Sequence, residues 1–501
     1  MLIAALRALV ISLTLLIYVL LSRDWITDSQ GLVAYTILML GYLSAETMNL
    51  RTQEPQWFWI NPVVLASLFT FVLAFGVSNV LYFMPEDVVA LVGLAPIATP
   101  WMNQLMFLVV LGALAMWLGY GSWMGRKLGR MLQKSRFLDQ WMTTSTRVNH
   151  PVIYACIVLS LGARLLMIKL GVYGFSSDYD QLIAGAAYTQ YLTMAESLGQ
   201  LALLGIAIQC FASSRSTLLD RQLLALVLVY EVAFGFLSGF KSQVFMPFIL
   251  VGLACYSQRG RFPRWVIPAV VVGLMAAYAV IEPFRVARHE DATFDGTSLG
   301  SIVTTMLTAS SGASNDEEGP NTALSILARI NLTYVASRGI EHAATSTLSE
   351  GSPTFLRDIL LAPAHAIIPR ILWEAKPFQN IGLWYTFEVM GWGDDILSST
   401  AMSPFTYLNF AGGPIAVVLG FLSVGIIQRA LFDGLRGFGG GGVIVLFGLL
   451  RNLVLIDSAF NTFFAAIIRF LPLFIWAQYL LLYRPRRSSE YPKPAATTTR
   501  F

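Results

Sequence analysis

Charged side chains are scarce in this chain of 501 residues. They make up 12% of the sequence, whereas hydrophobic residues make up 56%. A soluble domain carries roughly 25% charged residues. The composition therefore excludes an ordinary soluble domain and predicts a polytopic membrane protein. The basic residues follow the expected membrane topology, so the net charge of +4 does not indicate a nucleic-acid partner.

Cysteine and histidine are also rare. The three cysteines lie in apolar runs without a C-x-x-C pair, and the four histidines never stand at metal-ligand spacing. We therefore expect neither a disulfide framework nor a metal site. The chain also lacks G-x-x-x-x-G-K-[ST], a G-x-G-x-x-G after a strand, and G-x-S-x-G. We expect no bound cofactor, and any reaction would use an activated donor that is already in the membrane.

Long apolar runs dominate what is present. They predict an all-α polytopic membrane fold of about twelve transmembrane helices with one long outer loop. The runs lie near residues 2–21, 31–48, 60–82, 104–123, 151–170, 191–212, 222–240, 243–257, 265–283, 404–428, 441–458 and 462–482. The first run has no small-residue cleavage site after it, so we interpret it as an uncleaved helix.

The Lys and Arg residues between the runs predict the orientation. With a cytoplasmic N-terminus, the short outer loops hold only Arg23 and Lys241, with Lys169 at a boundary, and the inner segments hold many more cations. This bias places both termini in the cytoplasm and the long loop 284–403 on the periplasmic face of a bacterial inner membrane. We expect one integral-membrane domain, 1–483, and a disordered cytoplasmic tail, 484–501.

The outer loop has apolar residues at helical spacing over 322–345 and 355–368. Both stretches are too short or too polar to span, so we expect short surface helices that cap the spans. The loop then reaches Pro369-Arg370, Trp373 and Lys376-Pro377. The prolines restrict the backbone around two cations, and cations held near lipid usually meet an anion. Trp373 can stack on a sugar face, or it can be a plain interfacial anchor.

A second group of polar residues follows the ninth run. Arg285, Arg288 and His289 share a face if the helix continues for one turn, and Glu290 comes next. Two guanidiniums suit the oxygens of a pyrophosphate, while His289 and Glu290 are able to accept a proton near neutral pH. The alternative is a snorkelling interfacial anchor with solvated charges.

Further polar residues recur on the outer side and within the runs. Lys241 is the one cation of a tight outer turn, and Arg338 and His342 lie four residues apart on a predicted surface helix. A snorkelling turn residue and a solvated helix face are the alternatives. Charged residues inside membrane spans either have a function or pair with charges on other helices. The predicted spans contain seven of them, which are Glu46, Arg164, Glu196, Glu231, Arg451, Asp457 and Arg469.

The order of these residues resembles the oligosaccharide repeat-unit polymerases, the Wzy-type or O-antigen polymerase family of bacterial envelopes. The resemblance covers about residues 230–430. It consists of Gly239-x-Lys241, Arg285, Pro369-Arg370 with Lys376-Pro377, Ser403-Pro404, and Tyr407-x-Asn409-Phe410-x-Gly412-Gly413-Pro414.

The resemblance implies a glycosyltransferase that uses polyprenyl pyrophosphate, such as undecaprenyl pyrophosphate, as the lipid carrier. Such enzymes join lipid-linked oligosaccharide donors and acceptors into surface or exopolysaccharide, beside a flippase and a chain-length regulator. The expected substrate-binding residues are Lys241, Arg285, Arg288, Arg338, Arg370, Trp373, Lys376 and Asn409. His289, Glu290 and His342 stay open as the general base. A lipid-linked glycan ligase, a transporter or flippase, and a non-catalytic assembly partner are the alternatives.

Overall fold

The computed structural model describes residues 2–85, 98–174, 179–212, 216–290, 296–312, 322–346, 352–368, 370–373, 376, 381–391, 400, 402–456 and 460–483. Within these ranges the regular structure is helical, apart from one isolated bridge between Val148 and Leu482. The expected tail, 484–501, lies outside the described residues, as do Pro369, Pro377 and Asp457.

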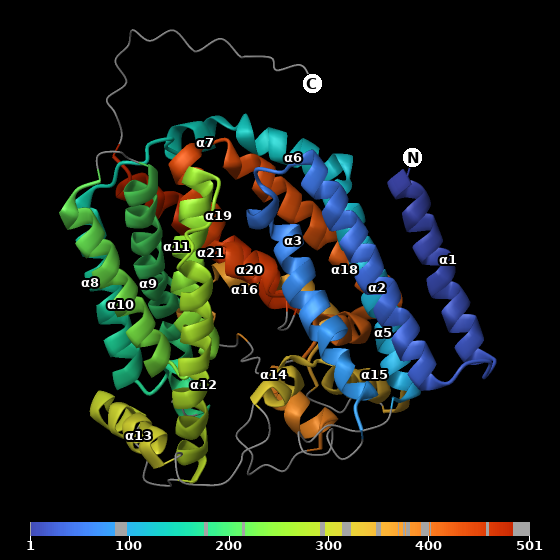
Figure 1. Cartoon of the computed structure of the whole chain (residues 1–501). Helices are drawn as coiled ribbons and strands as arrows, with labels where there is room; N and C mark the ends of the chain where they lie inside the picture. Colours follow the sequence, from blue (N-terminus) through green and yellow to red (C-terminus); the bar gives the residue numbers. More distant parts are fainter. Residues whose placement is uncertain are drawn as a thin grey trace.

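The long helices of the first half of the chain run roughly parallel or antiparallel to one another (Figure 1). The helices of this half are α1 Leu2–Ser22, α2 Asp28–Gln53, η1 Phe58–Ile60, α3 Pro62–Ala66, the π-helical η2 Ser67–Gly76, η3 Val77–Phe83, α5 Pro100–Gly121, α6 Trp123–Gln133, α7 Arg136–Trp141, α8 His150–Lys169, α9 Tyr179–Ala212, α10 Leu218–Leu237 and α11 Lys241–Arg259. In Figure 1, α6 and α7 lie across one end of the long helices. Caps set several boundaries: the Thr27 side chain accepts from the backbone of Gln30 at α2, and Pro100 follows the capping Thr99 at α5.

The second half contains the outer loop and the last long helices. They are α12 Val266–Glu290, α13 Leu299–Gly312, α14 Thr322–Ile330, α15 Thr333–Thr345, α16 Phe355–Ile367, η5 Arg370–Leu372, α17 Ile381–Trp384, η6 Tyr385–Val389, α18 Pro404–Arg436, α19 Gly439–Gly448, α20 Leu450–Val454 and α21 Phe460–Leu481. α18 begins where Ser403 caps Pro404, and its helical geometry breaks at Gly412 (φ 172°, ψ 29°) and Gly413 (φ 66°, ψ −157°). The φ and ψ of Gly413 are accessible almost only to glycine.

Nine helices of the described residues are long and apolar enough to cross a membrane. They begin at Ile3, Asp28, Pro62, Pro100, His150, Tyr188, Val266, Pro404 and Phe460. Three of the twelve runs expected from the sequence are not among them. The run 222–240 forms α10, which contains three charged residues (Asp220, Arg221 and Glu231), and the run 243–257 forms α11, which has polar residues at both ends. The run 441–458 divides into α19 and α20, which are too short to span.

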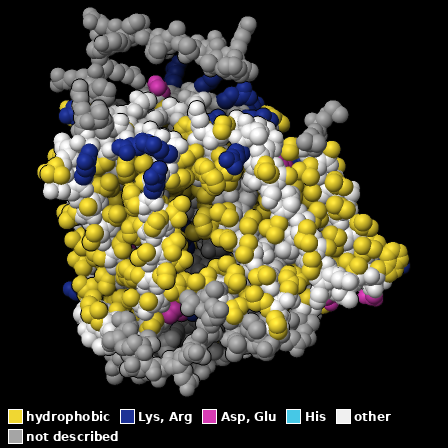
Figure 2. All heavy atoms as spheres, in the orientation of Figure 1, with side chains coloured by type: hydrophobic (Ala, Val, Ile, Leu, Met, Phe, Trp, Pro, Cys, Tyr) yellow, Lys and Arg dark blue, Asp and Glu magenta, His cyan; other side chains and the backbone are white. Residues whose placement is uncertain are grey.

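The surface supports a membrane-embedded arrangement. Figure 2 shows a belt of hydrophobic side chains around the middle of the face, with Lys and Arg side chains gathered near the end where α1 begins. Exposed apolar residues on α1, α8 and α12, such as Leu16, Val158 and Met275, belong to helices of spanning length. The chain therefore has the surface and the helices of a multi-pass membrane protein.

The helices form two groups that meet along α19 and α21. In one group α5 packs against α2 and α18, and in the other α9 packs against α8, α10 and α11. α19 and α21 contact α9 as well as each other, so they join the groups. Of the expected capping helices, α15 packs against α5 and buries Ala336 and Ile340, and α16 packs against α21.

Candidate functional site

The turn between α10 and α11 brings together two of the cations expected to bind substrate. Gly239 has a left-handed φ of 67°, a conformation that favours glycine. Its carbonyl oxygen accepts hydrogen bonds from Nε of Arg285 at 3.1 Å and from Nη2 at 2.8 Å. Lys241 starts α11 two residues later. Arg285 on α12 is thus fixed against the turn that presents Lys241.

A carboxylate and a third cation complete this group. Glu282 forms ion pairs with Lys241 and with Arg329 of α14, and Nζ of Lys241 lies 3.4 Å from the ring centroid of Tyr278. We call Lys241, Tyr278, Glu282, Arg285 and Arg329 the turn cluster. Three cations and one carboxylate give it a formal charge of +2. An anion with several oxygens fits that excess of positive charge.

A second group of cations lies at the end of α16. Nζ of Lys376 donates to the carbonyl oxygens of His365 at 2.7 Å and Ile368 at 2.9 Å, so the ammonium caps the last turn of the helix. The ring of Trp373 lies 5.2 Å from the ring of His365. Burial, with the positive charges of Arg469 and Arg370, lowers the pKa of Lys376. We call His365, Arg370, Trp373, Lys376 and Arg469 the loop cluster.

A polar cavity of about 410 Å³ lies between α9, α11, α19, α20 and α21. Its polar walls include Glu196, Gln200, Gln243, Arg451 and Asn452, and two phenylalanines complete them on the α21 side. A mixture of hydrogen-bonding groups and aromatic rings suits a sugar-sized ligand.

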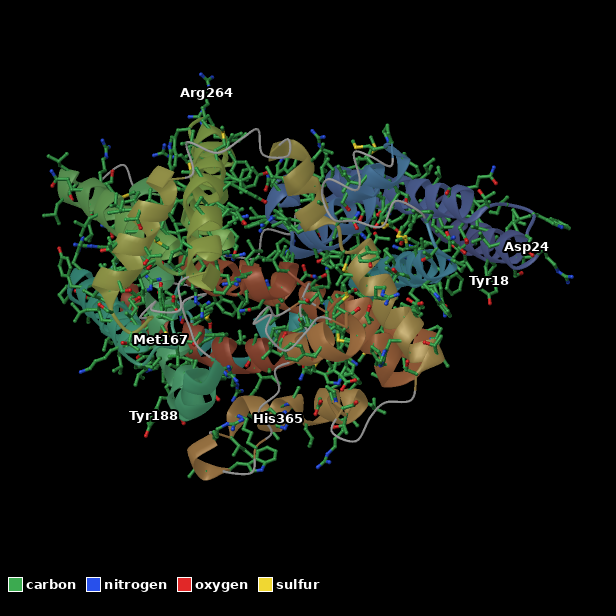
Figure 3. The ribbon with its side chains drawn as sticks, turned by 90° about the horizontal axis from the view of Figure 1, so that it is seen from below. Tyr18, Asp24, Met167, Tyr188, Arg264 and His365 are labelled. Atoms are coloured by element: carbon green, nitrogen blue, oxygen red, sulfur yellow. The ribbon has the colours of Figure 1, made fainter. Side chains whose placement is uncertain are left out.

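Residues that neighbour both clusters in the sequence line the cavity. Ser242 in its wall follows Lys241 directly, and Phe470 follows Arg469. Thr193 in its wall lies one turn from Gln190, whose side chain donates to the carbonyl oxygen of Ala366 at 3.2 Å. Figure 3 shows Tyr188 of α9 and His365 of α16 on neighbouring elements at this end of the molecule.

A smaller, largely apolar cavity of about 230 Å³ lies between η2, α14 and α20. Arg329 of the turn cluster is in its wall, and Leu455 lines both cavities. Figure 2 shows the surface hollowed in this region, between α12 and the segment from α3 to η3. An apolar chain could therefore reach the turn cluster from the side of the bundle.

Arg338 and His342 of α15 do not act as a pair. Nη1 of Arg338 bonds to Glu341 at 2.5 Å, and the His342 ring packs 6.3 Å from the rings of Trp384 and Phe410. The sequence spacing predicted that the two side chains share a face of the helix. In the structure each of them contacts a different partner. Asn409 is half-buried on α18, beside this aromatic group rather than in either cluster.

The other expected site residues stand as follows. Arg288 is half-buried on α12, one turn beyond Arg285. The side chains of His289 and Glu290 lie outside what the structure describes. No group of three or more metal-ligating side chains occurs among the described residues, and the three cysteines are buried and unpaired.

Two participants were missed as site residues on reading the sequence. Arg329 was one of several cations of the outer loop, and Glu282 was part of the stretch that leaves the membrane. Glu282 lies three residues before Arg285, hence on the same helical face, and this spacing was the available signal. Arg329 is 47 residues from Glu282, so only the fold reveals that pair.

Comparison of the chain with protein-family models, with curated proteins and with solved structures found no match in any of the three.

Proposed function

We propose that this protein is a membrane glycosyltransferase that polymerises polyprenyl-pyrophosphate-linked oligosaccharide repeat units. The observation that supports this most directly is that two cationic clusters each include a residue next in sequence to the wall of one polar cavity. Lys241, in the cluster with Arg285 and Arg329, directly precedes Ser242 of the wall. Arg469, in the cluster with Arg370 and Lys376, directly precedes Phe470 of the wall.

The chemistry follows from this arrangement. A glycosyl pyrophosphate gains negative charge on the departing phosphate as the sugar leaves, and fixed guanidinium and ammonium groups stabilise that charge. The turn cluster supplies three such groups, which are Lys241, Arg285 and Arg329. The polar cavity offers room for a sugar, and the apolar cavity beside Arg329 offers room for part of a lipid chain.

The side of the membrane on which the reaction would occur follows from the Lys and Arg bias of the short loops. The Lys- and Arg-rich segments face the cytoplasm, so the clusters face the outer side of a bacterial inner membrane. Donor and acceptor would both be lipid-linked there, and the growing glycan would remain outside. The N- and C-termini are cytoplasmic in this proposal.

Arginine substitutions test the proposal in cells. Arg285→Ala and Arg370→Ala should each abolish long-chain polysaccharide while single repeat units still accumulate, because each change removes a fixed charge from one cluster. Arg23→Ala is the matched control, since Arg23 is an exposed cation of the turn between α1 and α2, outside both clusters. Polysaccharide chain length on a gel, with the membrane abundance of each variant, is the measurement. Normal chain lengths in both cluster variants would refute the assignment.

An acceptor assay separates the polymerase from its rivals. Purified protein in vesicles receives a lipid-linked donor with either a second lipid-linked repeat unit or a lipid core as acceptor. Transfer to the repeat unit supports a polymerase, and transfer to the lipid core alone supports a ligase. Movement of repeat units across the vesicle membrane without transfer would support a flippase.

A further inference from the structure

A buried ion-pair network crosses three helices beside the polar cavity. Nη2 of Arg164 on α8 pairs with Glu231 of α10 at 2.7 Å, and Nε pairs with Glu196 of α9 at 3.3 Å. The side chains of Arg164 and Glu231 are 3% and 2% exposed, while that of Glu196 is 17% exposed. We call these three residues the triad. Glu196 is the member that also forms part of the cavity wall.

The surroundings hold the triad in place. The Arg164 guanidinium lies 4.9 Å from the ring centroid of Tyr230, whose hydroxyl donates to Ser160 at 3.1 Å. Ser160 in turn donates to the backbone carbonyl of Glu196 at 2.8 Å. A Cβ at Gly199 would overlap the carboxylate of Glu231, so α9 passes the triad at a glycine. These contacts fix the positions of the three side chains, unlike those of an exposed surface ion pair.

The triad has room for one proton. With all three groups ionised, one guanidinium faces two carboxylates and leaves a formal charge of −1. An uncompensated charge in a buried site is costly, and one added proton removes it. The other charged or titratable groups nearby are Tyr173 and Tyr230 and, across the cavity wall, Arg451. Of the two carboxylates, Glu196 is the one in the cavity wall, so it is the one that a bound sugar would contact.

Glu196 is connected to elements that carry both cationic clusters. It is six residues along α9 from Gln190, a distance of about 9 Å at 1.5 Å per residue, and Gln190 contacts the end of α16. On the other side, Ser242 shares the cavity wall with Glu196 and follows Lys241. A sugar in this cavity would have a carboxylate beside it and a cationic group at either edge.

We propose that Glu196 is the general base of the transfer, an inference that rests on the proposed function. A hydroxyl oxygen of the acceptor sugar forms a bond to the anomeric carbon of the donor. The bond from that carbon to the pyrophosphate oxygen breaks, and its electron pair leaves with the pyrophosphate. The hydroxyl proton passes to the carboxylate of Glu196. Arg164 and Glu231 are positioning residues, because they act through Glu196.

Substitution of Glu196 gives the first test. General bases contribute about 10²- to 10⁴-fold in rate, so Glu196→Gln should lower polymerisation in vesicles by that factor. Glu196→Asp should keep part of the activity, because it keeps a carboxylate. Glu388→Gln, an exposed carboxylate outside the cavity, is the control. Pyrophosphate-dependent thermal stabilisation of each variant confirms that it is folded and still recognises the anion.

The positioning residue has its own signature. In Glu231→Gln the Arg164 guanidinium loses its 2.7 Å ion pair with Glu231, so it holds Glu196 less firmly. The kcat of polymerisation should therefore fall while the KM for the lipid-linked donor stays the same, a split that a merely structural defect would not produce. Glu231→Asp, which keeps a carboxylate, should restore part of the kcat.

The outcomes separate the inference from the function beneath it. Absence of polymer from the wild-type protein would overturn the proposed function itself. Equal polymerisation by the wild type and Glu196→Gln would overturn only the role of Glu196. A large loss in His342→Asn, with Glu196→Gln unaffected, would likewise overturn it and assign the base to His342.

Discussion

Replacing Glu282 by Gln should lower the stability of the protein without ligand and increase the Tm shift that pyrophosphate causes. The change keeps the size of the side chain but removes the one carboxylate of the turn cluster, leaving Lys241, Arg285 and Arg329 as close like charges. The Glu282, Lys241 and Arg329 side chains are 24%, 13% and 46% exposed, so solvent screens part of the effect.

The exposures set the expected size of the loss. Exposed pairs contribute about 0–1 kcal/mol, and hydrogen bonds to charged groups contribute about 1.5–3 kcal/mol. A half-buried carboxylate with two cationic partners falls between these, so we expect a loss of about 2 kcal/mol and a Tm lower by a few degrees. A ligand at 100 times its Kd adds about 2.7 kcal/mol. Bound pyrophosphate is therefore able to offset the lost pairs.

Thermal unfolding in nanodiscs with millimolar sodium pyrophosphate is the assay, with sodium chloride at the same ionic strength as the reference. Pyrophosphate should raise the Tm of Glu282→Gln more than that of the wild type, where the anion competes with the carboxylate. Glu341→Gln removes the partner of Arg338 away from the turn cluster and should show the wild-type response. Equal pyrophosphate shifts in Glu282→Gln and the wild type would refute the reasoning.

Two further predictions concern packing and pH. Gly425→Ala should destabilise the protein by about 1–3 kcal/mol, because its Cβ would overlap the backbone of α5. Gly162→Ala is the control and should leave the Tm unchanged, because its Cβ would meet nothing within 4 Å. Equal Tm values for the two variants would contradict this prediction. The lowered pKa of Lys376 means that its ammonium loses its proton at a lower pH than a free lysine. Pyrophosphate affinity should fall as the pH rises toward about 10, and should fall less in Lys376→Arg; identical pH dependences would exclude Lys376 from anion binding.

Local sequence signals predicted the elements that depend on local forces. Apolar runs identified the long helices, and Ser403-Pro404 marked the start of α18 because a capping side chain and a proline favour that position. The run 441–458 predicted one spanning helix because its hydropathy is continuous. In the structure the helix is interrupted after Gly448, so the run forms α19 and α20 instead. Hydropathy reports burial and not helix continuity.

The candidate site was predictable only in part. Arg370 and Lys376 were expected to meet Arg285 and Lys241, because all four leave the membrane on the same side. The fold joins Arg285 to the turn before Lys241 through Gly239, but Lys376 bonds to the end of α16 in a separate cluster. The role of Glu282 as the carboxylate shared by Lys241 and Arg329 depends on three separate helices, and no short motif encodes it. The polar cavity is further still from sequence reasoning, since five helices form its walls.

The break at Gly412–Gly413 separates two parts of α18 that pack against different elements. Before it, Thr406 donates to the carbonyl of Ala336 in α15 and Tyr407 to that of Phe355 in α16, whereas the part after Pro414 packs against α5 and α6. Phe405 before the break also stacks on Phe421 after it at 4.6 Å, so the two parts are held to each other. One chain segment thus acts as a bracket: its first turns hold two short helices of the outer loop, and its long remainder holds the core of the bundle.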